Sequence, residues 1–234
     1  MNTAANIMEL DHVSVRYKSR RSFFRHTYFT ALDEVSFSII KGETLGIVGT
    51  NGCGKSTLLR VLANIYGIDA GQVNWYCRQV SLLTLALGFD PELSGRDNAI
   101  LSGMLLGARK ADVLDKIDEI IEFSELKDFI YKPIKTYSTG MRARLGFSVA
   151  VTMQSELLLI DEVMSVGDGK FKRKAEAAMV NKISSDQTVV LVSHSLPQLS
   201  KVCDRVLWLN EGKVIMIGAV DEVLQEYECF LEKR

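Results

Sequence analysis

This sequence of 234 residues lacks the long apolar runs, signal peptide and cysteine spacing that are typical of membrane proteins, secreted proteins and zinc-binding domains. No apolar run approaches the roughly 18 residues that a membrane-spanning helix needs, and runs such as 157–160 have the length of a core strand. Residues 1–12 contain no basic cluster followed by an apolar run, so we expect no secretory signal and a chain that stays in the cytosol. The four cysteines lie far apart without C-x-x-C spacing, which favours reduced thiols over a zinc site or a disulfide framework.

The sequence also has no excess of positively or negatively charged residues. The 28 Lys and Arg against 29 Asp and Glu leave a formal net charge of -1. No global basic field therefore exists to attract nucleic acid or anionic lipid, and any phosphate binding must be local. The sequence has no internal repeat or low-complexity segment, and its 47% hydrophobic and 24% charged residues are typical of one folded domain, in one or two lobes.

Apolar periodicity predicts a β-rich start to the chain. Residues 7–17 and 35–39 alternate as half-buried strands do, and the basic segment 18–25 between them breaks this period, as a loop or a hairpin insertion would. A short buried-type strand, 43–48, runs into glycine, and the apolar spacing over 55–66 indicates a helix. The glycine-rich segment therefore lies between a strand and a helix.

Helix formers predominate in the middle of the chain, and strands return after residue 156. The predicted elements are strands near 72–75 and 80–85, helices 96–106 and 111–123, strand 157–161, helix 170–183, strand 188–192, helix 196–202, strands to 217 and a last helix. This order predicts an α/β protein with a parallel sheet, interrupted by a helical insertion spanning about 86–155.

The segment 49–56 matches the pattern G-x-x-x-x-G-K-[ST] of a phosphate-binding loop. The candidate ATP-binding residues are Gly49, Thr50, Asn51, Gly52, Cys53, Gly54, Lys55, Ser56 and Thr57. The glycines let backbone N–H groups surround a phosphate, and the predicted helix adds its positive end. Lys55 would reach the β- and γ-phosphates, and the Ser56 hydroxyl would help to hold Mg²⁺. The alternative is a glycine turn capped by a lysine.

Two carboxylates, Asp161 and Glu162, end the apolar run 157–160. A parallel strand beside the phosphate loop would deliver both to the nucleotide. Because Mg²⁺ prefers carboxylate oxygen and keeps several waters, we expect Asp161 to act on the ion through water. Glu162 is then the candidate base for the attacking water. The alternative is a pair of acidic residues that close a strand at a helix cap.

A second buried-type strand, 190–192, ends in Ser193 and His194. The neutral ring of His194 could donate a hydrogen bond to a γ-phosphate oxygen, which makes this histidine a candidate catalytic residue beside Glu162 and Lys55. A single histidine after a strand is more often structural, so this interpretation depends on the other motifs.

The order of these motifs resembles an ABC-transporter ATP-binding subunit from end to end. The segment Tyr137-Ser138-Thr139-Gly140-Met141 is similar to the ABC signature, with Thr139 in place of the usual second glycine and Met141 in place of the usual glutamine. The resemblance implies a P-loop NTPase with a RecA-like parallel core, an antiparallel β subdomain and a helical subdomain. It also implies that Ser138 and Gly140 form a second phosphate cradle, which serves the nucleotide of the opposite subunit, and that Asp168 is the D-loop aspartate of that dimer.

Three segments narrow the resemblance to the ATPases that export bacterial cell-surface polysaccharides such as O-antigen, capsule and teichoic acid. They are 87–98, 137–145 and 161–168. Some O-antigen ATPases carry a C-terminal carbohydrate-binding domain. The present sequence ends directly after its last predicted helix, so we expect a single ATP-binding domain over 1–234 without that addition.

One residue usual in the family is missing. Most ABC ATPases place a glutamine that senses magnesium and water at the junction of core and helical lobe, but 80–95 contains none. Thr84 or Leu85 falls nearest that position, and we assign the role to neither. By its place after the first strand, Tyr17 is expected to stack on adenine, with Tyr28 as the alternative because the intervening segment is long. Ordinary core packing is the other alternative.

The resemblance implies an ATPase that uses ATP and Mg²⁺. Its partners would be a second copy of itself and integral-membrane permease subunits, at the cytoplasmic face of the inner membrane, with no nucleic acid. The glycan would be lipid-linked and carried outward. The alternatives are the ATPase of another ABC exporter, a soluble ABC ATPase that acts on ribosomes or DNA, and a regulatory module that binds ATP without turnover.

Two groups of side chains carry weaker expectations. The apolar residues near the edge of the helical lobe fit core packing, which we favour, or a surface that receives a coupling helix of a membrane partner. They are Phe89, Leu93, Leu101, Met104 and Leu105. The basic group after Asp168 is expected to be a solvated helix face. It consists of Lys170, Lys172, Arg173 and Lys174.

Overall fold

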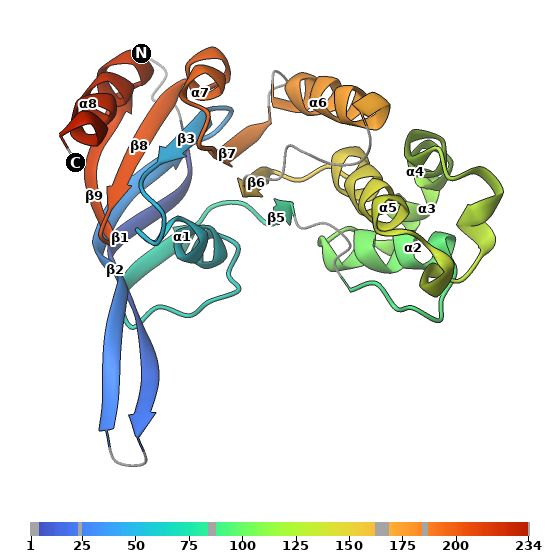
Figure 1. The fold of residues 1–234 in the computed structure, drawn as a ribbon, viewed down its shortest axis with the longest axis horizontal. Coiled ribbons are helices and arrows are strands. Elements are labelled where there is room, and N and C mark those ends of the chain that lie inside the picture. The colour runs from blue at the N-terminus through green and yellow to red at the C-terminus, as the bar shows by residue number, and fades with distance from the viewer. Residues whose placement is uncertain (1–4, 23–24, 84–87, 162–168, 184–186, 234) are drawn as a thin grey trace. The chain divides into compact units, whose positions relative to one another are not determined.

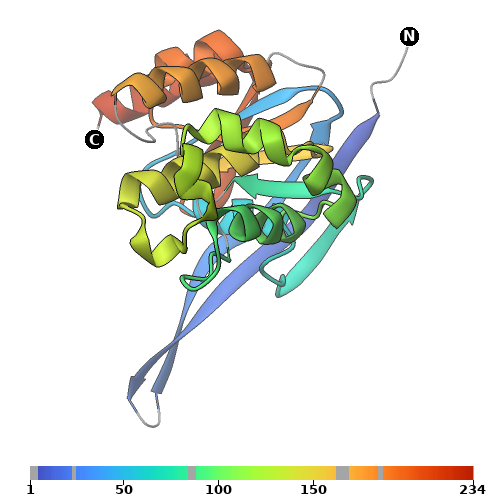
Figure 2. The same cartoon turned by 90° about the vertical axis from the view of Figure 1, so that its right-hand side faces the viewer.

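A computed structural model describes residues 5–22, 25–83, 88–161, 169–183 and 187–233. The chain divides into two compact units. The first unit joins Met1–Arg78 with Asp186–Arg234, and the second is Gln79–Ser185. Figures 1 and 2 show both units as ribbons.

An antiparallel β lobe opens the first unit. Strand β1 (Asn6–Ser22) lies between β2 (Arg25–Ile40) and β4 (Ala70–Trp75) and is antiparallel to both. Pairing of β1 with β2 continues from Tyr17 opposite Phe29 to Ser22 opposite Arg25, so the hairpin alternative for the basic segment is confirmed. The far end of this hairpin stands clear of the other strands of its unit, and Figure 2 shows its two strands twisting about each other.

A sheet with parallel central strands forms the core of the first unit. Strand β3 (Thr44–Val48) pairs in parallel with β7 (Thr188–Val192) and with β8 (Arg205–Asn210). Every residue of β3 and β7 is buried, as continuous apolar strands of a parallel sheet require. Strand β9 (Lys213–Ala219) runs antiparallel to β8, because Glu211 and Gly212 both have positive φ and close a two-residue hairpin.

Three helices complete the first unit: α1 (Lys55–Leu62), α7 (Leu196–Val202) and α8 (Val220–Glu232). Helix α1 is shorter than the predicted 55–66. Asn64 adopts φ 55°, and the N–H groups of Ile65 and Tyr66 both donate to the carbonyl of Arg60. This left-handed residue ends the helix, although the apolar spacing continues past it.

The second unit contains the parallel strands β5 (Val80–Leu83) and β6 (Leu157–Asp161) and a group of helices. The helices are α2 (Gly95–Leu105), α3 (Lys110–Asp115), α4 (Ile117–Ser124), the 3-10 turns Lys127–Tyr131 and Ile134–Thr136, α5 (Thr139–Thr152) and α6 (Gly169–Ile183). The single helix predicted over 111–123 is wrong. Lys116 has φ −104° and donates its N–H to Val113, three residues back, which separates α3 from α4.

These elements have the predicted α/β class, with parallel strands, an antiparallel β lobe and helices α2 to α5 inserted between β5 and β6. Strand β6 and helix α6 group with the inserted helices in the second unit. The carboxyl ends of β3 and β7 and the N-terminus of α5 carry the candidate site residues.

Candidate nucleotide-binding site

The phosphate loop joins the end of β3 at Val48 to the start of α1 at Lys55. Gly54 precedes the helix at φ 112°, and a Cβ built on it would lie 2.5 Å from the carbonyl oxygen of Ala31. Only glycine fits this conformation and this approach of β2. Because glycine has no side chain to cap α1, the N–H groups of the first turn receive no side-chain cap from it and remain suited to a phosphate.

Lys55 lies across this loop. Its buried ammonium group donates to the carbonyl oxygens of Gly49 at 2.7 Å and of Thr50 at 3.0 Å. These bonds hold the charge at the loop in a position to meet an anion. Cys53, a residue of the loop itself, is buried, and burial raises the pKa of its thiol. Ser56 is exposed at the start of α1, where a hydroxyl ligand for Mg²⁺ is expected.

His194 is exposed after β7 and lines a pocket of about 330 Å³ together with Gly49, Thr50 and Asn51. The two parallel strands β3 and β7 end side by side, which brings the loop and the histidine to one edge of the sheet. Ser193 is buried and donates to Gln198, and it accepts from the N–H of Ser195, so this serine shapes the turn that presents His194.

Tyr17 and Phe29 lie near the phosphate loop, and Tyr28 precedes Phe29 on β2. The hydroxyl of Tyr17 is 3.1 Å from that of Thr57, and its ring packs edge-on against Tyr66 at 6.0 Å. Tyr28 is 66% exposed on β2. Phe29, which sequence reasoning missed, is 59% exposed and lines a pocket of about 350 Å³ with Thr50–Cys53. The register of a bulged hairpin decides which aromatic reaches the loop, and no periodic signal reveals that register.

Asp161 is half-buried at the carboxyl end of β6. The carboxylate of Asp161 in the second unit and the hydroxyl of Ser56 in the first are each an oxygen donor of the kind that Mg²⁺ selects, so the chemistry of each residue fits this ion. Glu162, Asp168, Thr84 and Leu85 lie outside the described residues. Within the described ranges, no group of three or more His, Cys, Asp or Glu side chains could by itself hold a metal.

The signature segment forms the N-terminus of α5. The hydroxyl oxygen of Ser138 accepts the N–H of Met141 at 3.2 Å and caps the helix, which leaves the hydroxyl proton available to another acceptor. Thr139 and Gly140 are exposed. A Cβ on Gly140 would meet only Ser138 Oγ, at 3.9 Å, so nothing within this chain's second unit requires glycine there.

The chain before Ser138 is tied to the loop that begins α2. The N–H groups of Ile134 and Lys135 donate to the carbonyls of Leu93 and Pro91, and the N–H of Gly95 donates to Lys132. A salt bridge of 2.6 Å joins Lys135 to Glu92. This short antiparallel connection places the segment 87–98 beside the residues that directly precede the segment 137–145.

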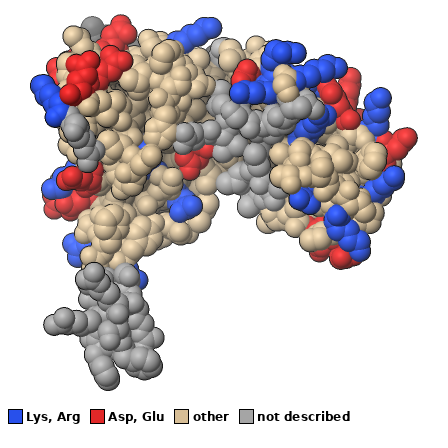
Figure 3. Space-filling view, viewed as in Figure 1, with Lys and Arg blue, Asp and Glu red and all other residues tan. Residues whose placement is uncertain are grey.

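Two expectations about side-chain groups need correction. Core packing is wrong for Leu93, Met104 and Leu105, which are 39%, 44% and 52% exposed. Lys and Arg side chains gather over α6 (Figure 3), but Lys174 is half-buried and paired with Glu125, so it does not belong to a solvated face.

In the parts of the chain that the structure describes, no helix is long and apolar enough to cross a bilayer.

Comparisons with known proteins agree with this geometry. The family model for ABC transporters matches residues 32–165. The O-antigen export system ATP-binding protein RfbB of Myxococcus xanthus is 43% identical over 85% of this chain and 45% of its own length. The teichoic acids export ATP-binding protein TagH of Enterococcus faecalis is 42% identical over 88% of this chain and 46% of its own length. The chain thus spans less than half the length of these two relatives.

A shorter relative is covered more fully. The O-antigen export system ATP-binding protein RfbB of Klebsiella pneumoniae is 39% identical over 86% of this chain and 81% of its own length. Among solved structures, the ATP-binding cassette MJ0796 in a dimeric state with ADP and Pi has a TM-score of 0.72 at 20% identity, over 91% of this chain and 98% of that chain. The expected resemblance is therefore confirmed, and the chain belongs to the ABC transporter family, with the fold of an ATP-binding cassette.

Proposed function

We propose that this chain binds and hydrolyses ATP as one of two identical subunits that power a membrane permease, which exports a lipid-linked cell-surface polysaccharide. The observation that carries the proposal is the set of relatives. Proteins about 40% identical over most of this chain are named as ATP-binding proteins of O-antigen and teichoic acid export systems. The phosphate loop supplies the chemistry that such a subunit needs.

The phosphate loop holds the nucleotide. Lys55 moves from the carbonyls of Gly49 and Thr50 to the β- and γ-phosphates, and the N–H groups from Thr50 to Thr57 donate to phosphate oxygens. Ser56 and Asp161 would hold Mg²⁺, Asp161 through water, and the ion would supply positive charge that offsets the charge of the phosphates. An aromatic ring, Tyr17, Tyr28 or Phe29, stacks on the adenine.

A second copy completes the site. Its Ser138 donates the hydroxyl proton that the helix cap leaves free, and the first N–H groups of its α5 face the γ-phosphate. Gly140 has no Cβ, which leaves room for the phosphate against the helix. Asp168 is assigned from the family resemblance as the D-loop aspartate of the pair. Contacts to both subunits disappear on hydrolysis, which allows the pair to separate.

Hydrolysis uses the residues at the ends of β6 and β7. Glu162 follows Asp161 and accepts the proton of the attacking water. His194, which shares a pocket with Gly49–Asn51, donates from its ring to a γ-phosphate oxygen. Without Glu162 the proton has no acceptor, so Glu162→Gln should keep ATP bound without turnover.

The permease docks on the helical insertion, which we take as 86–155. The exposed side chains of Leu93, Met104 and Leu105 support this assignment, because apolar side chains of this size favour burial against a partner. Docking on a permease places the chain at the cytoplasmic face of the inner membrane. No excess of positive charge is present to bind nucleic acid.

The test is an export assay in the cells that make this chain. We expect deletion to remove the surface polysaccharide and to leave lipid-linked glycan inside, and wild-type protein to restore export. Glu162→Gln should fail to restore it, whereas Glu228→Gln, the same change at an exposed position of α8, should succeed. Unchanged surface polysaccharide after deletion, with ATP hydrolysis by the purified chain intact, would assign the ATPase to another export system or to a soluble process.

A further inference from the structure

Glu125 lies where α4 ends and the chain turns toward the signature segment. It has φ 56° and ψ 23°, the left-handed conformation. Glycine or asparagine usually occupies such a position, since a larger side chain there costs free energy. Ser124 supports the turn, because its hydroxyl donates to Ile121 and accepts the N–H of Leu126. The left-handed conformation of Glu125 ends α4 and turns the chain toward the 3-10 turn that begins at Lys127.

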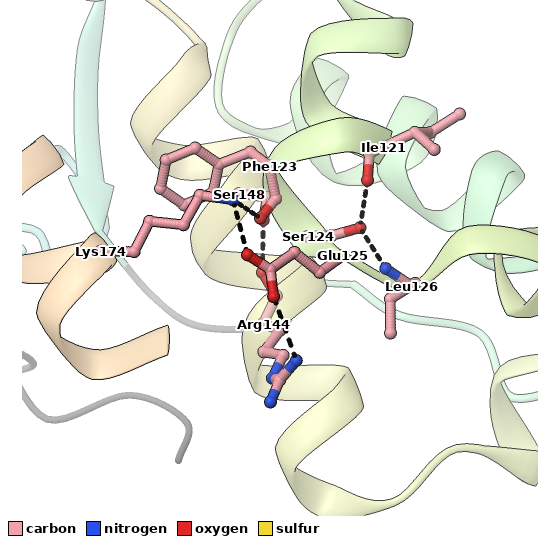
Figure 4. A network of polar contacts seen from close by, with 8 residues as sticks. All are labelled: Ile121, Phe123, Ser124, Glu125, Leu126, Arg144, Ser148 and Lys174. Carbon is pink, nitrogen blue, oxygen red and sulfur yellow. Dashed lines mark hydrogen bonds and ion pairs between the residues drawn. The ribbon is translucent and has the colours of Figure 1, made fainter. Parts of the chain in front are cut away.

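The carboxylate of Glu125 lies between two cations from two other helices (Figure 4). Its Oε1 accepts from Lys174 Nζ of α6 at 3.1 Å, and its Oε2 lies 4.0 Å from Arg144 Nη1 of α5. Lys174 also donates to the carbonyl of Phe123 at 2.9 Å. The three charged side chains are 33%, 35% and 21% exposed for Glu125, Lys174 and Arg144.

Aromatic rings hold both cations in place. Lys174 Nζ lies 4.5 Å from the ring centre of Phe123, and the guanidinium of Arg144 lies 5.2 Å from that of Phe171. Phe123 and Phe171 contact each other edge-on, with centroids 5.8 Å apart. An exposed ion pair contributes little because ordering two long side chains costs entropy. Here packing has already ordered both cations, so a shared carboxylate joins them at a smaller cost.

Both cations belong to helices that bear candidate site residues. Arg144 lies six residues after Ser138 on α5, and Lys174 lies six residues after Asp168, on the helix that follows it. Glu125 and Arg144 also line, with Ser138 and Gly140, a pocket of about 330 Å³ beside the signature segment. Glu125 therefore borders the same pocket as the residues of the proposed phosphate cradle. Lys174 lowers the pKa of the Glu125 carboxyl, which keeps it ionised.

We infer that Glu125 is a positioning residue, which fixes the signature end of α5 against α6 by joining Arg144 to Lys174. This inference rests on the proposed function, in which Ser138 and Gly140 act on the ATP of a second copy. Glu125 touches no nucleotide itself. Its role is to keep the cradle in one orientation while two copies close.

The experiment measures ATP-dependent dimerisation in the Glu162→Gln parent, where bound ATP is not consumed. Glu125→Gln is added to remove the charge, and Glu125→Gly to remove the side chain while relieving the left-handed strain. Glu122→Gln, at an exposed position of the same helix, is the control. We expect both Glu125 variants to weaken dimerisation about tenfold, with ADP affinity at the phosphate loop unchanged and the control equal to the parent.

The outcomes separate this inference from the proposed function. Glu125→Gly removes the ion pairs and the left-handed strain together, so thermal unfolding is measured beside dimerisation. Weaker dimerisation at an unchanged unfolding temperature supports the positioning role, and weaker dimerisation that only follows a loss of stability contradicts it. If both Glu125 variants dimerise as the parent does, or lose ADP affinity in parallel with dimerisation, the positioning role is wrong while the shared ATP site stands. If the parent stays monomeric with ATP bound, the shared site itself is wrong, and this inference with it.

Discussion

Gly95 and Tyr137 pack so closely that a Cβ on Gly95 would overlap the Tyr137 hydroxyl. That hydroxyl donates to the carbonyl of Phe129 at 2.5 Å, and burial raises the pKa of Tyr137 to about 12. Tyr137 directly precedes Ser138, so the start of α2 fixes the residue next to the signature serine. Backbone hydrogen bonds between 91–95 and 132–135 reinforce the same connection.

Gly95→Ala should lower the free energy of unfolding by about 1 to 3 kcal/mol, because Tyr137 cannot move away without losing its hydrogen bond. Urea unfolding measures this. Gly67→Ala is the control, because a Cβ on Gly67 would meet nothing within 4 Å. If the two variants unfold at the same urea concentration, the close packing of Gly95 on Tyr137 is not a constraint.

Gly140→Ala should behave in the opposite way. A Cβ fits beside Ser138 Oγ, and alanine favours a helix, so stability should stay the same or rise by up to about 1 kcal/mol. ATP hydrolysis should nevertheless fall at least about tenfold, because the methyl group takes the room proposed for the phosphate of the second copy. Hydrolysis at the wild-type rate would place that phosphate elsewhere.

The thiols should differ in reactivity toward an alkylating reagent. Burial raises the pKa of Cys53, and it raises that of Cys203 to about 12, so neither is a thiolate at pH 8. Cys229 is exposed on α8 and should react before Cys53 and Cys203, as mass spectrometry of the digested protein would show. ATP should slow the reaction of Cys53 further and leave Cys229 unchanged. Equal labelling of Cys53 and Cys229 in the folded protein would contradict this order.

Lys182 should make stability depend on pH. Its ammonium donates to the carbonyls of Val151 and Met153 at the end of α5, and burial lowers its pKa from 10.5 to about 8. Between these values the unfolded state holds a proton that the folded state has lost, so this group's contribution to stability increases with pH from about 8 to 10.5. Wild type should therefore gain stability relative to Lys182→Met as pH rises from 7 to 10. A constant difference would show that the ammonium stays charged in the fold.

The phosphate loop and the buried strands of the core could be predicted because both depend on local signals. A glycine pattern between an apolar strand and an amphipathic helix identifies the loop, and continuous apolar runs identify β3 and β7. The end of α1 could not be placed, since a left-handed Asn64 stops the helix while apolar spacing continues. The break at Lys116 was missed for the same reason: Val113, Ile117 and Ile120 keep a helical period across it.

The residues that shape the signature segment leave no local signal. Gly95 meets Tyr137 across 42 positions, and Glu125 meets Lys174 across 49. Lys174 belongs to a basic run that predicts a solvated face, yet Phe171 and Ala175 are buried on the same helix and bring it to the edge of the core. Contacts of this kind follow from helix packing, which composition and periodicity do not determine.

The mass of purified Glu162→Gln in solution, with and without ATP and Mg²⁺, tests the central claim of a site shared by two copies. Light scattering should give the monomer mass of 26.1 kDa without ATP and twice that mass with it. Adding Lys55→Ala should abolish the increase, because the phosphate loop then loses the cation that holds the nucleotide. A monomer mass with ATP demonstrably bound would contradict a shared site and would leave Ser138 and Gly140 without a phosphate to bind.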